Sequence, residues 1–157
     1  MYKRQAPAGF SAGALDLDIQ GHILHHMDIT RTEDAFLIDV PAAQFDSLLK
    51  FLTMMVFWSE VTVEEADIAI LTLLGDTDIA TPPMVEFSRE VQWSGIRRID
   101  LGVPRESLVE ATKWLEESGA RLAGLMAFTA ERVRAREPEL AADLDNKSCL
   151  LYTSPSP

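Results

Sequence analysis

The chain has 157 residues, 47% of them hydrophobic, and a formal net charge of -11 from 14 basic and 25 acidic residues. This length suits about one domain, and so apolar a composition argues against global disorder. The acidic balance disfavours direct nucleic-acid binding, because contact with phosphate needs clustered lysine and arginine. No run of about 18 apolar residues is present, so the sequence predicts no membrane span.

Three short strands are predicted in the N-terminal quarter of the chain. Alternating polarity predicts a strand over residues 14–18, and two more are expected over 22–30 and 35–40. Between the first two, Asp18-Ile19-Gln20-Gly21 is a turn signal, because aspartate opens such turns and glycine adopts a positive φ at little cost. Short links between the three segments favour an antiparallel meander, preceded by a Gly/Ala-rich loop over 6–13.

A helix and two further strands are predicted in the middle of the chain. Pro41 suits a first helical turn. Apolar residues then recur at i, i+3, i+4 and i+7, namely Phe45, Leu48, Leu49 and Leu52. Strands are expected over 68–74 and 97–103, with an irregular loop over 75–83 between them.

Two more helices are predicted in the last third of the chain. Pro104 opens the first of them, and Gly119 sits where a C-cap glycine belongs. Its expected buried line consists of Leu108, Ala111 and Leu115. The second helix should span 124–137, stopped by Pro138, with a loop over 141–148 beyond it. Strands and helices mixed in this way predict an α+β fold, an antiparallel sheet with packed helices.

The two ends of the chain read as sequencing-library adapter. Met1-Tyr2-Lys3-Arg4-Gln5 is encoded by GTG-TAT-AAG-AGA-CAG when GTG serves as a start codon. The reverse complement of these bases, read one base in, encodes Cys149-Leu150-Leu151-Tyr152-Thr153. It matches a transposon end used to tag fragmented DNA. We therefore expect residues 1–5 and 149–157 to be adapter-derived tails, and such ends do not belong in fold reasoning.

The natural material is then expected to span about residues 6–148, open at both ends. Without Lys3 and Arg4, 12 basic residues stand against 25 acidic ones, a net charge of -13. Cys149, the single cysteine, falls in a suspected tail. No disulfide framework or thiolate metal site is therefore expected.

All three histidines of the chain, His22, His25 and His26, lie within five residues. On a helix they would share a face and could hold a metal. On a strand, His22 and His26 share one face about 13 Å apart, and His25 points to the other. The strand interpretation is preferred, so no metal site is predicted.

Several other side chains are interpreted by their surroundings. Arg132, Arg134 and Arg136 are expected on the solvated side of their helix, because charged side chains are usually exposed. Met54-Met55 is expected to fill the core at the end of the first helix. The tryptophans are expected at core or interface positions, namely Trp58, Trp93 and Trp114.

Short motifs in the first half of the chain follow a recognisable order. They are Asp18-Ile19-Gln20-Gly21-His22-Ile23, Phe36-Leu37-Ile38-Asp39, Leu48-Leu49-Lys50-Phe51-Leu52 and Val61-Thr62-Val63-Glu64-Glu65. This series resembles the YgfZ-type folate-binding proteins, relatives of the glycine-cleavage T-protein, an aminomethyltransferase. The resemblance implies a partial GcvT-like folate-binding domain over residues 6–148.

The second half resembles the same family. The corresponding stretches are Ile99-Asp100-Leu101-Gly102-Val103-Pro104, Ala130-Glu131-Arg132-Val133-Arg134 and Asp143-Leu144-Asp145-Asn146-Lys147-Ser148. The family's most specific motif, Lys-Gly-Cys-Tyr-x-Gly-Gln-Glu, lies further downstream and is not in this chain. The resemblance therefore implies that the chain is a fragment that lacks the family's principal functional site.

The resemblance also implies candidate residues for a folate cleft. The T-protein pattern Gly-Gly-Ile-Leu-Asp-Asp-Leu places its acidic pair on His25 and His26, and a pterin-binding glutamate falls on Arg134. Histidine can act as an acid or base near neutral pH but does not reproduce a carboxylate. A guanidinium only donates hydrogen bonds. These departures argue against aminomethyltransferase activity, so no catalytic residue is assigned.

The function implied is that of a cytoplasmic tetrahydrofolate-binding helper of iron–sulfur cluster assembly or repair. Its partners would be folate and iron–sulfur enzymes or assembly factors, and it would support tRNA modification only indirectly. Two alternatives stay open, a folate-dependent aminomethyltransferase and an interaction domain without a ligand.

Overall fold

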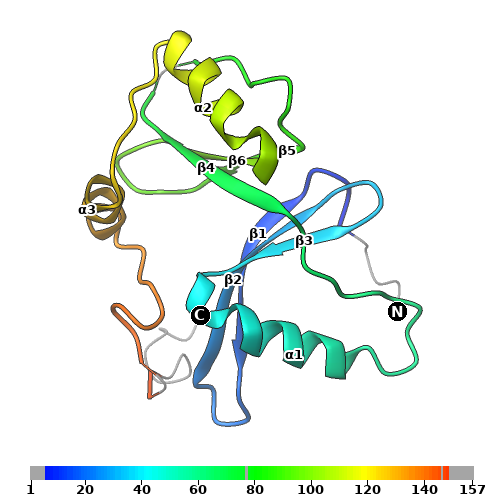
Figure 1. Ribbon diagram of the computed structural model, residues 1–157. Helices are drawn as coiled ribbons and strands as arrows, with labels where there is room; N and C mark the ends of the chain where they lie inside the picture. The colour runs from blue at the N-terminus through cyan, green and yellow to red at the C-terminus, as the bar shows by residue number, and fades with distance from the viewer. Residues whose placement is uncertain (1–5, 77, 146, 149–157) are drawn as a thin grey trace. The chain divides into compact units, whose positions relative to one another are not determined.

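The computed structural model describes residues 6–76, 78–145 and 147–148. The described residues form two compact units: unit 1 comprises residues 6–66 and 139–148, and unit 2 comprises 67–138. Each unit contains one three-stranded antiparallel sheet. Helix α1 belongs to unit 1, and α2 and α3 belong to unit 2 (Figure 1). The class is α+β, as predicted, with the strands divided between two sheets.

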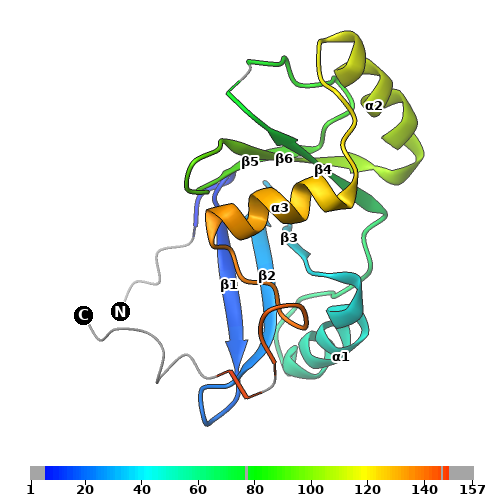
Figure 2. The same ribbon diagram turned by 90° about the vertical axis from the view of Figure 1, so that its left-hand side faces the viewer.

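The sheet of unit 1 is the predicted antiparallel meander. Its strands are β1 (Ser11–Leu17), β2 (Ile23–Arg31) and β3 (Phe36–Asp39), in the order β1-β2-β3. Figure 2 shows β1 and β2 as the two long strands of this sheet. Strand β1 begins inside the segment expected to be loop, because Ser11 pairs with Thr30 of β2.

The turn between β1 and β2 has the predicted chemistry. Gly21 adopts φ 83°, and its N–H donates to the Asp18 carbonyl oxygen at 3.0 Å. The Asp18 Oδ1 atom accepts from the N–H groups of Gln20 and His22, at 2.8 and 2.9 Å. The His22 ring lies 2.9 Å from Asp18 Oδ2. The carboxylate therefore organises the whole turn.

The contacts of Asp18 in this turn predict that the free energy of unfolding depends on pH. The His22 N–H, then the His22 ring, and to a smaller extent the Gln20 N–H lower the pKa of Asp18 below its ordinary value of 3.8. A folded-state pKa below the unfolded one gives stabilisation that is full above 3.8 and is lost as pH falls through the folded value. Near neutral pH, Asp18→Ala should therefore unfold at a lower urea concentration than wild type. In acid, this difference between the two midpoints should disappear. A gap that stays constant would contradict this.

Helix α1 (Phe45–Met55) follows a short 3-10 turn over Ala42–Gln44. Of its expected apolar stripe, only Leu48 is fully buried, on the side that faces the meander. The prediction that Met54-Met55 fills the core is wrong, because both methionines are exposed at the free end of the helix.

The sheet of unit 2 has the order β4-β6-β5. Its strands are β4 (Ile68–Leu74), β5 (Phe87–Val91) and β6 (Arg98–Pro104). The sequence did not predict β5, since Arg89 and Glu90 interrupt the apolar pattern of this five-residue strand. The helices are α2 (Leu108–Glu117) and α3 (Leu125–Ala135).

The core of unit 2 is centred on β6, which lies between the other two strands. Its Leu101 and Val103 are buried together with Ala111 and Leu115 of α2. Leu108, also predicted for that line, is only half-buried. Gly119 ends the α2 segment with φ 103°, the left-handed conformation expected of a C-cap glycine. The buried line predicted for α2 is therefore correct except at its first residue, Leu108.

Gly102 of β6 is the position where glycine is required by packing. A Cβ atom there would lie 2.0 Å from the ring of Phe87, its cross-strand partner on β5. The Phe87 ring thus occupies the space beside Gly102 where a side chain would stand, which only glycine permits.

Within the described part of the chain, none of the helices has the length and apolar character needed to cross a membrane.

Candidate functional site

His25 is the centre of a hydrogen-bonded cluster in unit 1. It lies on β2 opposite Asp16 of β1, and its Nδ1 atom is 2.9 Å from Asp16 Oδ2. Its Nε2 atom is 2.9 Å from the hydroxyl oxygen of Ser47, on the first turns of α1. The ring also stacks on Phe51, with centroids 6.2 Å apart. The buried imidazole therefore joins β1, β2 and α1.

An aspartate, a histidine and a serine in series are the parts of a nucleophilic hydrolase site. In this chain the Ser47 hydroxyl donates to the Gln44 carbonyl oxygen at 2.9 Å. Its hydrogen is thus used to close the first turn of α1 and is not directed solely at His25. The arrangement ties the helix to the sheet, and we assign it a structural role.

His26, the next residue, lies on the opposite face of β2 and is half-buried. Its backbone N–H donates to the Gln44 side-chain oxygen at 3.0 Å. Gln44 is itself buried. The strand alternation predicted for the histidines is therefore correct. No group of three potential metal ligands occurs among the described residues.

Unit 2 contains a buried charge cluster centred on Asp100 of β6. Arg89 Nε and Nη2 donate to Asp100 Oδ2 at 3.2 and 3.1 Å. Arg98 adds two bonds to the same carboxylate, at 3.0 and 2.6 Å. The Thr72 hydroxyl donates to Oδ1 at 2.7 Å. Because Asp100 is fully buried, the two guanidinium groups supply the compensation that a buried carboxylate needs.

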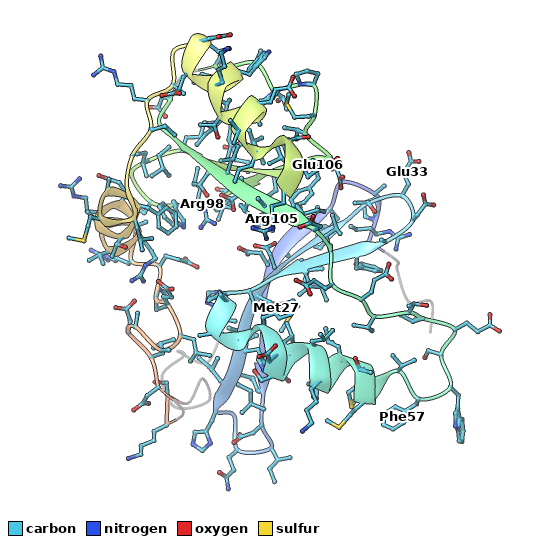
Figure 3. The ribbon with its side chains drawn as sticks, viewed as in Figure 1. Met27, Glu33, Phe57, Arg98, Arg105 and Glu106 are labelled. Atoms are coloured by element: carbon cyan, nitrogen blue, oxygen red, sulfur yellow. The ribbon has the colours of Figure 1, made fainter. Side chains whose placement is uncertain are left out.

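Arg98 also connects this cluster to aromatic side chains. Its guanidinium lies 4.7 Å from the centre of the Trp93 ring and 5.7 Å from that of Phe128 on α3. The two rings lie 5.5 Å apart. Figure 3 labels Arg98, which projects from β6. Cation–π contacts of this kind hold α3 against the sheet of unit 2.

A pocket of about 920 Å³ opens in unit 2. It is lined by strands β4, β5 and β6, by α2, and by residues 120–125 with Phe128. Its lining includes many aliphatic residues, three arginines (Arg89, Arg97 and Arg121) and three acidic residues (Asp78, Glu90 and Glu116). A concave, largely apolar site with a few charged groups is typical of small-molecule pockets.

The three arginines of the pocket differ in their partners, and Arg89 belongs to the Asp100 cluster. Arg97 pairs with Asp78 at 3.2 Å and with Glu90 at 3.5 Å. The hydrogen bonds that Arg97 donates to Glu90 and, to a smaller extent, to Asp78 raise the pKa of Arg97 above its ordinary value. No ion pair within the described residues engages the exposed Arg121. Arg121 is therefore the lining cation available to an anionic ligand.

The three residues expected at a folate cleft are divided between the two units. His25 and His26 point to opposite faces of β2, and both ring nitrogens of His25 have partners within unit 1. Arg134 belongs to unit 2, where it is exposed and pairs with Glu131 of the same helix. It does not line the pocket.

The prediction of a solvated Arg132 is wrong, because this side chain is buried. Its Nη1 donates to the Glu137 carbonyl oxygen at 2.6 Å, so the arginine folds back over the end of α3. Arg134 and Arg136 are exposed, as predicted. Helix α3 ends at Ala135 because Arg136 adopts φ 61°, before Pro138 is reached.

The Asp100 cluster was not predicted, although the sequence carries a signal for it. Asp100 interrupts an otherwise apolar strand, and a charge at the centre of such a strand requires a partner. The partners Arg89 and Thr72 lie 11 and 28 residues away along the chain. Only the strand register reveals them, since both stand directly beside Asp100.

No known protein-family model matches the chain, and no curated protein matches it.

Proposed function

We propose that the chain is part of a YgfZ-type folate-binding protein that takes tetrahydrofolate as its cofactor. In this proposal the protein acts in the cytoplasm and supports iron–sulfur cluster assembly or repair, with iron–sulfur enzymes or assembly factors as partners. It influences tRNA modification through those enzymes. The net charge of -11 favours such an indirect role over contact with RNA.

The observation that carries the proposal is the order of the motifs along the elements. The Asp18–Gly21 motif lies in the β1–β2 turn, and Phe36–Asp39 coincides with β3. The paired leucines lie in α1, and the Val-Pro motif ends β6 just before α2. These four motifs thus occur in the family's order along a turn, a strand, a helix and the end of a strand, and this order supports the proposal.

Two features of the described residues bear on the alternatives. His25 is buried, and its two ring nitrogens contact Asp16 and Ser47 within unit 1, which favours a structural role for the ring over proton transfer to a substrate. This favours folate binding without aminomethyltransferase activity. The pocket of unit 2, with Arg121 in its lining, favours a ligand over a ligand-free interaction domain.

The proposal makes a prediction about the gene. Reading genomic DNA of the source through the position of Cys149 should show Ile-Pro-x-Glu soon after Ser148 and Lys-Gly-Cys-Tyr-x-Gly-Gln-Glu further on. An uninterrupted genomic frame that ends after Pro157 would contradict the proposal.

The matching biochemical test is calorimetric titration with tetrahydrofolate. The product of the longer reading frame should bind it, and the 157-residue chain should bind weakly or not at all, because much of the cleft is expected downstream. Absence of binding by the longer protein would favour the ligand-free domain. Methylene transfer to a lipoyl carrier protein would instead favour the aminomethyltransferase.

A further inference from the structure

The end of α1 and the segment after it expose a group of large apolar side chains. We call this group the aromatic tip, and it consists of Met54, Met55, Phe57, Trp58 and Val61. Their exposed fractions are 59%, 51%, 74%, 100% and 60%. Figure 3 shows the ring of Phe57 projecting away from the ribbon at the far end of α1. These five exposed apolar side chains lie within eight consecutive residues, whereas exposed apolar residues are usually scattered singly.

The backbone of the aromatic tip is strained. Phe57 has φ 45°, a left-handed conformation that glycine usually supplies at the end of a helix. A bulky side chain is disfavoured in this conformation. The turn after α2 has glycine, Gly119, at its position of positive φ. Since the Phe57 ring is exposed, its burial does not compensate for the strain, and a role outside the folded chain explains it better.

From Met54 to Glu65 the charged residues all have one sign. Glu60, Glu64 and Glu65 are all exposed. Between Phe51 and Ala66 the sequence contains no lysine or arginine. A complementary surface must therefore combine apolar groups with positive charge.

We propose that the aromatic tip docks a basic amphipathic segment of a partner protein, a helix whose apolar face is bordered by lysine or arginine. Trp58 and Phe57 would enter the apolar face, and the three glutamates would meet its basic border. Tryptophan is enriched among the residues that dominate interface affinity. This inference rests on unit 1 alone and does not depend on folate binding.

Charge selects this occupant over two others. A second copy of the chain also carries -11 and would place its own glutamates against these. An anionic membrane surface would be repelled in the same way, since surface helices that bind it carry lysine and arginine beside their apolar face. Of the three occupants, the basic amphipathic segment alone complements both the exposed apolar side chains and the neighbouring glutamates.

A defined peptide tests the proposal with the full chain. The probe is a fluorescein-labelled helix of about 14 residues, roughly four turns, with leucine on one face and lysine on the other. One control has the same composition in scrambled order, and another replaces every lysine with glutamate. Fluorescence anisotropy should show binding of the first peptide only, weakening as salt is added.

Variants locate the binding surface. Trp58→Ala and Phe57→Gly should each weaken binding by at least about tenfold, as expected for an aromatic anchor. Phe57→Gly keeps a residue suited to the left-handed conformation, so circular dichroism should show an intact fold. The matched control is Ile19→Ala, which removes a fully exposed apolar side chain from the β1–β2 turn and should leave binding unchanged.

Charge reversal completes the design. Glu64→Lys with Glu65→Lys should weaken binding and reduce its salt dependence, whereas Glu116→Lys with Glu117→Lys on α2 should not. The proposal is overturned if Trp58→Ala binds as wild type does, if the scrambled or acidic peptide binds as tightly, or if no peptide binds. Dimers that Trp58→Ala abolishes, or binding to anionic vesicles through the tip, would overturn it in favour of the other occupants.

Discussion

Asp100→Ala is expected to destabilise the protein by about 3–5 kcal/mol, the cost typical of removing one partner from a buried ion pair. The carboxylate is fully buried and accepts hydrogen bonds from Arg89, Arg98 and Thr72. Its removal deprives two poorly exposed guanidinium groups of a shared counter-charge and leaves a cavity between three strands. The measurement is urea unfolding at neutral pH, followed by circular dichroism.

Asp67→Ala provides the matched control, because Asp67 pairs with Arg105 at 3.0 Å where both side chains are exposed. An exposed pair contributes less than about 1 kcal/mol. If the two variants unfold at the same urea concentration, the Asp100 cluster does not stabilise unit 2 in the way described above.

His25→Ala is expected to cost about 2–4 kcal/mol, from lost packing and from partners left without hydrogen bonds. The ring fills the space between β2 and Phe51, and it contacts Asp16 and Ser47. Its loss disconnects α1 from the meander. Urea unfolding and proteolysis of the α1 segment should both report the change.

His22→Ala is the comparison for this variant, because His22 lies at the turn and is partly exposed. Within the described residues, the polar contact of its ring is with the neighbouring turn residue Asp18. Its effect should be much smaller. A His25→Ala protein as stable as His22→Ala would show that the ring is not a structural link, and the cluster would then need a different role.

Local sequence signals predicted the elements that depend on local chemistry. The Asp18–Gly21 turn, the three strands of the meander and the left-handed Gly119 all follow from backbone preferences of single residues. Strand β5 was missed because its alternation is polar and its stability comes from pairing with β6. Its partner is known only once the chain has folded.

The candidate site was less accessible to sequence reasoning. The opposite faces of His25 and His26 follow from strand geometry alone. The partners of His25 do not, since Asp16 and Ser47 lie 9 and 22 residues away and meet it only through the sheet register and the docking of α1. The methionines of α1 were placed in the core because helix periodicity does not tell where the sheet beneath the helix ends.

The split of unit 1 between two stretches of sequence has a consequence for synthesis. Residues 67–138 leave the ribosome as one uninterrupted block, so unit 2 can pair its strands as soon as it emerges. Unit 1 must wait for residues 139–148, whose Ser148 carbonyl accepts the N–H of Ile23 at 3.1 Å. Strands β1 to β3 can therefore pair with one another early, but they gain this contact with Ser148 only after all of unit 2 has been translated.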